Sequence, residues 1–152
     1  MSSKSSEIKT AIKNLMVELQ KTDLNPTGIL GEIIEDDFKI NNPLDRDISS
    51  FPAVIINPPS VEGVAYDNAR NIRTYTFNLG VILKGEDISS ASEVEELMEA
   101  LMDKLDNHPT LNSVCDGGVE PSISSPEPTT SRGKTFVVFV ITIKAKGITT
   151  LT

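Results

Sequence analysis

The chain has 152 residues, of which 38% are hydrophobic and 5% aromatic, and it carries a formal net charge of −8. This length is enough for one domain with a hydrophobic core, built here mainly from Ile, Leu and Val. Because nucleic acids and anionic membranes are bound by clustered cations, an acidic chain without a basic run is a poor candidate for either.

Cysteine usage and hydropathy indicate the cellular compartment in which the chain folds. The one cysteine, Cys115, cannot form an internal disulfide, which excludes a disulfide-built fold. Residues 1–13 are polar and lack the apolar segment of a signal peptide. No apolar run approaches the roughly 20 residues of a membrane span. We therefore expect a chain that does not enter membranes and that folds in a reducing cytoplasm.

Residues 5–21 are predicted to form an amphipathic helix, because apolar residues recur there every three or four positions. The apolar stripe consists of Ile8, Ile12, Leu15, Met16 and Leu19. Asn25-Pro26 and Gly28 end this helix. Residues 29–35 predict a strand, and the polar residues 36–50 predict a mobile exposed loop.

Two further strands are predicted before the second helix. Residues 51–57 form a short apolar run closed by Pro58-Pro59, which is typical of a buried strand between breakers. Residues 71–83 alternate between two faces and are rich in β-branched and aromatic residues, which predicts the longest strand.

A second amphipathic helix is predicted from Ser92 to Leu105. Ser90 with Glu93, and Ser92 with Glu95, have the spacing of a capping box. Its apolar stripe consists of Val94, Leu97, Met98, Leu101, Met102 and Leu105. Its outer face is acidic and consists of Glu93, Glu95, Glu96, Glu99 and Asp103.

The remaining residues predict two more strands. Residues 119–124 indicate a short strand, residues 124–134 a mobile polar loop, and residues 135–146 a last strand. The first half of that last strand is apolar on both faces, which indicates a central or interfacial position. The fold class is therefore α+β: one domain over residues 1–152, with a mostly antiparallel, mixed β-sheet and two amphipathic helices packed on one face.

Three patterns imitate chemical sites, and each lacks a requirement. Residues 128–135 end in Gly-Lys-Thr like a phosphate-binding loop, but the first glycine is replaced by Pro128 and a strand follows in place of a helix. His108 and Cys115 do not have the spacing of a nucleophile and base on one helix face. One His and one Cys cannot build a structural zinc site. We expect no catalytic residues, no metal and no cofactor.

Asp67, Arg70 and Arg73 stand where a loop enters the long strand. Arginine is enriched at protein interfaces and forms bidentate ion pairs with carboxylates. These three residues are therefore candidates for a contact between subunits. A local surface pair between Asp67 and Arg70 within one subunit is the equally open alternative.

The segment Asp67–Phe77, with Arg-Thr-Tyr-Thr-Phe at its end, resembles a segment of the tail terminator and tail-completion (head-tail joining) proteins of long-tailed bacteriophages. The order of the other elements agrees over nearly the whole chain: a leading amphipathic helix, the strand Phe51–Ile56, an acidic helix and a final strand.

The resemblance implies a structural virion protein without enzymatic activity. Such proteins form a ring, usually of six subunits, that caps the tail tube, ends tube polymerisation and presents a surface to the head completion or connector protein. DNA would pass through the lumen without specific binding, which suits six copies of a chain with a charge of −8. The implied location is the head-proximal end of the virion tail, and the host cytoplasm during assembly. A monomeric bacterial protein-binding or regulatory module is the alternative.

Overall fold

The computed structural model describes residues 4–36, 48–65 and 67–150, with side chains up to Gly147. The elements in chain order are α1 (Lys4–Glu18), β1 (Ile33–Glu35), β2 (Ala53–Ile56), β3 (Ser60–Ala65), β4 (Arg70–Lys84), the short 3₁₀ helix η2 (Gly85–Asp87), α2 (Ala91–Asp106), β5 (Val119–Ile123), β6 (Glu127–Ser131) and β7 (Lys134–Thr150). Most of the loop predicted over 36–50 lies outside the described residues.

A seven-stranded sheet is the centre of the fold, and its spine is the antiparallel pair of β4 and β7. β2 and β3 pair with successive segments of the same side of β4, and β5 and β6 pair with the opposite side of β7. Among the strands of the described residues, β1 and β2 form the one parallel pair. The predicted α+β class with a mixed, mostly antiparallel sheet is confirmed, and β7 is central, as its two apolar faces indicate.

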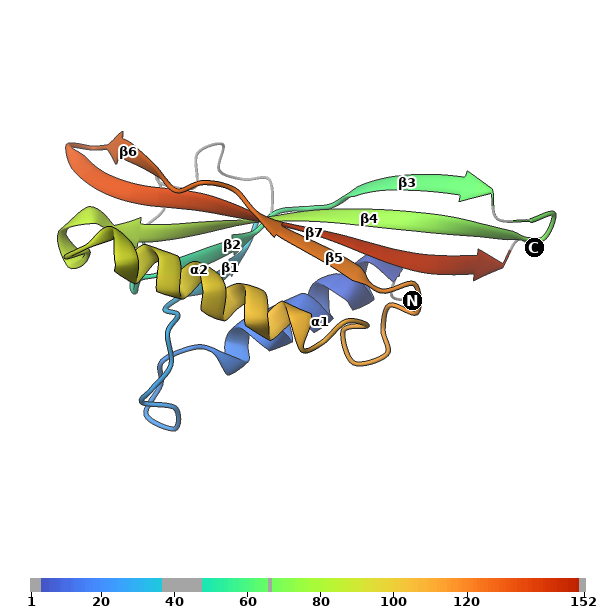
Figure 1. Ribbon diagram of the computed structural model, residues 1–152, viewed down its shortest axis with the longest axis horizontal. Helices are drawn as coiled ribbons and strands as arrows, with labels where there is room; N and C mark the ends of the chain where they lie inside the picture. Colours follow the sequence, from blue (N-terminus) through green and yellow to red (C-terminus); the bar gives the residue numbers. More distant parts are fainter. Residues whose placement is uncertain (1–3, 37–47, 66, 151–152) are drawn as a thin grey trace.

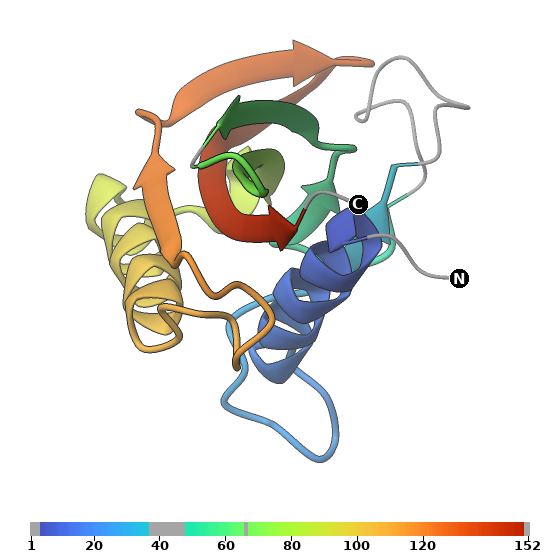
Figure 2. The same ribbon diagram turned by 90° about the vertical axis from the view of Figure 1, so that its right-hand side faces the viewer.

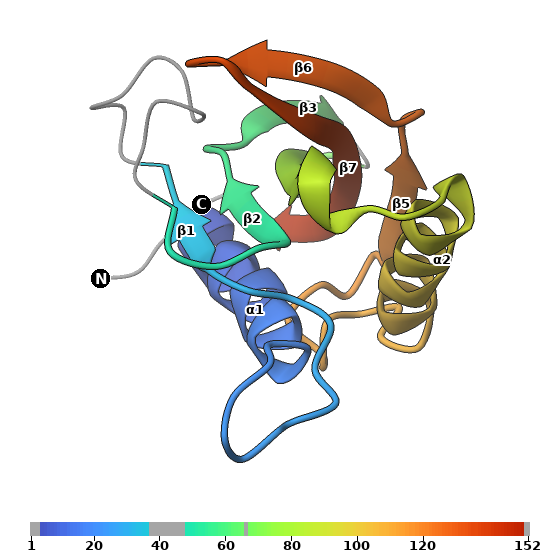
Figure 3. The ribbon, with the colours of Figure 1, turned by 90° about the vertical axis from the view of Figure 1, so that its left-hand side faces the viewer.

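Both helices cover the same face of the sheet, as predicted (Figure 1). Viewed from either end, the sheet curls above α1 and α2, which lie side by side below it (Figures 2 and 3). The main core lies in this layer, where the stripes of both helices meet the odd-numbered residues of β4 and β7. Its largest fully buried side chains include Phe77, Phe139, Leu15, Met16, Leu101 and Leu105.

A smaller apolar cluster lies on the other face of the sheet, near the start of β2. Ile55, Ile82 and Phe136 are buried there. The ring of Phe51 stacks on that of Phe136 with centroids 6.0 Å apart. The even-numbered residues of the long strands are therefore apolar at this end of the sheet, which explains why the first half of β7 is apolar on both faces.

Two strands were not predicted, and one of them corrects the loop expected over residues 124–134. Glu127–Ser131 forms β6, which pairs with β7 through a tight turn at Arg132 and Gly133. Both turn residues have positive φ, 52° for Arg132 and 75° for Gly133, as the two central residues of a tight hairpin turn require. Pro128 conceals this strand in the sequence, because proline is tolerated only on a sheet edge. β3 is the other strand, and its residues do not alternate in hydropathy.

The ends of two predicted elements also differ from the expectation. α1 ends at Glu18, and the chain then folds back so that Leu19 O accepts hydrogen bonds from the backbone N–H groups of Ile29 and Leu30, at 2.8 and 3.0 Å. These bonds occupy the backbone of Ile29 and Leu30 outside the sheet. The strand predicted over 29–35 is therefore confined to Ile33–Glu35.

Candidate interaction surfaces

An arm projects from the end of the sheet that holds the start of β4. It consists of β3, the first residues of β4 and the last residues of β7, which extend beyond the helices (Figure 1). Every residue of β3 is exposed. Val61 is 52% exposed and Val64 is 67% exposed, and they point to opposite faces because side chains alternate along a strand. Neither face of β3 therefore contributes to the core.

The arm has an unpaired edge on each side. Among the described residues, β3 pairs only with β4, and beyond Lys146 the outer edge of β7 has no strand partner. A free edge exposes backbone donors and acceptors that can pair with another chain. β5 and β6 each carry a proline, Pro121 and Pro128, which protects such edges, whereas β3 has none.

The structure brings two of the three predicted interface residues together. Asp67 Oδ2 accepts hydrogen bonds from Arg70 Nε at 2.8 Å and from Arg70 Nη2 at 2.6 Å, and its Oδ1 accepts from the N–H of Ala69 at 2.8 Å. These bonds, chiefly the one from Arg70, lower the pKa of Asp67. The pair is local and exposed, so within one subunit the alternative of a local surface pair is what forms.

Arg73 lies apart from that pair. Residues 70 and 73 differ by an odd number, so their side chains point to opposite faces of β4. Arg73 is exposed, and its cross-strand neighbours are Gly63 on β3 and Gly147 on β7. It forms no ion pair with another described residue. With a glycine on each side, the guanidinium of Arg73 is laterally accessible on the arm.

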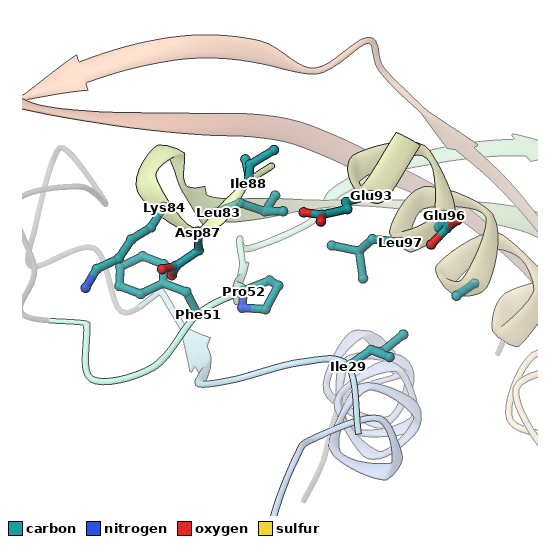
Figure 4. Close-up of a pocket in the computed structure, with 11 residues that line it drawn as sticks. Ile29, Phe51, Pro52, Leu83, Lys84, Asp87, Ile88, Glu93, Glu96 and Leu97 are labelled. Atoms are coloured by element: carbon teal, nitrogen blue, oxygen red, sulfur yellow. The ribbon is translucent and has the colours of Figure 1, made fainter. Parts of the chain in front are cut away.

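A pocket of about 340 Å³ lies between the start of α2, η2 and the chain before β2 (Figure 4). Its lining is mostly apolar, and it includes Ile29, Phe51, Pro52, Leu83, Ile88, Leu97 and Ala100. Three exposed acids, Asp87, Glu93 and Glu96, stand at its rim. The pocket results from tertiary packing of segments distant in the chain, and no sequence pattern indicated it.

The charges around the pocket are partly fixed by local contacts. Glu93 accepts hydrogen bonds from the hydroxyl and the backbone N–H of Ser89, and these bonds lower its pKa. Lys84 Nζ lies 5.3 Å from the centroid of the Phe51 ring and 3.7 Å from a carboxylate oxygen of Glu86. Lys84, the cation beside the pocket, therefore interacts with residues of its own chain, and the exposed carboxylates make the rim acidic.

The residues of the patterns that imitate chemical sites take part in packing, hydrogen bonds and a hairpin within the fold. Cys115 is fully buried, its Sγ lies 2.7 Å from Lys146 O, and burial raises the pKa of its thiol. A raised pKa keeps the sulfur in the unreactive thiol form. His108 Nδ1–H donates to Lys104 O at 2.9 Å, at the end of α2. The Gly-Lys-Thr sequence lies in the β6–β7 hairpin, without a helix N-terminus behind it.

Among the described residues, no group of three or more His, Cys, Asp or Glu side chains is placed to hold a metal ion. None of the described helices is long and apolar enough to cross a membrane.

Comparison with known proteins adds no family to these observations. No family model matches the sequence. No curated protein matches it either.

Proposed function

We propose that this chain is a structural subunit of a bacteriophage tail, which assembles into a ring, of six copies by the resemblance, and caps the tail tube. The ring would end tube polymerisation and offer the surface that the head completion or connector protein joins. It would act at the head-proximal end of the virion tail, after assembly in the host cytoplasm. The proposed role requires binding of protein partners and no reaction step.

The exposed arm is the observation that carries this proposal. A monomer gains nothing from a three-stranded projection that covers no core and leaves two edges unpaired, since such edges favour aggregation. An assembly subunit needs such edges, because an added strand contributes a row of backbone hydrogen bonds. Val61 and Val64, which are exposed in the free chain, would then supply apolar contacts to the neighbouring subunit.

The direction of the strands is compatible with ring closure. β3 and β7 are both antiparallel to β4, so they run parallel to each other on the two sides of the arm. If β3 of one copy lies along the free edge of β7 of the next, all copies keep the same orientation. Such a head-to-tail contact closes into a ring when the rotation between copies divides a full turn.

Arg73 extends the proposed contact beyond the backbone. It is exposed on the arm, between two glycines that leave space for a neighbouring chain. Arginine in such a position can pair with a carboxylate of the adjoining subunit, and α2 offers several on its exposed face. Asp67 and Arg70 are already paired, so they would serve the interface by holding the entry to β4.

The test is assembly in the presence of the tube. The purified chain is mixed with tubes of the major tail protein of the same virus, and binding is followed by sedimentation and electron microscopy. We expect rings at tube ends and an arrest of tube growth. A chain that remains monomeric at all concentrations and neither binds tubes nor limits their length would contradict the proposal.

A monomeric protein-binding module is the second candidate function, and the apolar pocket favours it. A preformed apolar pocket with a few polar groups at its rim is a usual binding site. Under this reading the chain would stay monomeric, ignore tail tubes and bind one cellular partner through the pocket. The same sedimentation experiment therefore separates the two functions.

A further inference from the structure

We draw no further inference here: the strongest candidate, the apolar pocket between the start of α2, η2 and the chain before β2, carries none, because nothing in the described structure shows what covers it.

Discussion

The body of this molecule, where the two helices cover the sheet, and the arm, where the sheet is uncovered, are built from the same long strands but differ in burial. In the body, the odd-numbered residues of β4 and β7 lie beneath two helices, and Phe77 and Phe139 are fully buried. In the arm, the same strands run on beyond the helices and join β3, whose residues are all exposed. The strands are continuous, so the change along them is in what covers the sheet. We infer that the body provides folding stability and that the arm is kept for a partner.

The largest expected effect is a loss of folding stability when a core side chain of the body is removed. Phe77→Ala removes a fully buried ring from the main core and leaves a cavity. It should lower the free energy of unfolding by about 3–5 kcal/mol. Urea denaturation followed by circular dichroism measures this loss. A loss below about 1 kcal/mol would mean that Phe77 is not part of a close-packed core.

Substitutions in the arm should leave folding stability nearly unchanged and should weaken binding to tail tubes. Replacing both Val61 and Val64 with lysine adds charge to an exposed edge strand, which is how proteins prevent edge pairing. The free energy of unfolding should change by no more than about 0.5 kcal/mol per site, because neither side chain contacts the core. Binding to tail tubes should fall at least tenfold. Thr10→Lys, an exposed change on α1, is the matched control.

A smaller effect is expected where the two helices meet. Lys104 Nζ of α2 lies 2.7 Å from Glu18 Oε2 of α1, and the hydrogen bond from Lys104 lowers the pKa of Glu18. Glu18 is largely exposed, so the pair should contribute less than about 1 kcal/mol. Because the pKa of Glu18 is lowered in the folded state, this contribution is complete above the ordinary glutamate pKa of 4.5 and is lost as the pH falls through the folded-state pKa.

A double-mutant cycle with Glu18→Gln and Lys104→Met tests this sign. The coupling between the two residues should be present at pH 7 and vanish near pH 2. A coupling that grew on acidification would show that the pair does not stabilise the contact between the helices.

The smallest effect is expected at the base of the arm. Asp67→Asn removes the carboxylate that Arg70 binds, but the pair is exposed and lies outside the core. The denaturation midpoint should therefore not move measurably. An altered binding to tail tubes, without such a shift, would indicate that the pair orders the entry to β4 for assembly. A large drop in the midpoint would contradict the placement of this pair on the surface.

The body could be predicted from the sequence far better than the arm. Helical spacing of apolar residues located both helices, and strict alternation located β4, because burial on one face imposes a period on the sequence. β3 has no such period, since none of its residues is buried, and it was not predicted. β6 was missed for another reason, because Pro128 argues against a strand unless the strand lies on a sheet edge. The exposure of every residue of β3 therefore explains both why this strand was not predicted and why it is suited to bind a partner.

The candidate sites show the same limit. Asp67 and Arg70 are three positions apart, and their local pairing could be stated as one of two alternatives. The opposite orientation of Arg73 follows only from the observed strand, and the pocket follows only from the packing of α2, η2 and the chain before β2.

The most direct test of the arm is hydrogen exchange of its backbone amides, compared between the free chain and the chain bound to tail tubes. Outer-edge amides of β3 and of β7 beyond Lys146 should exchange quickly in the free chain and become protected on assembly, while core amides of β4 stay protected throughout. If tube-bound protein shows no added protection in these two segments, the arm is not the contact between subunits, and the proposed function loses the observation that carries it.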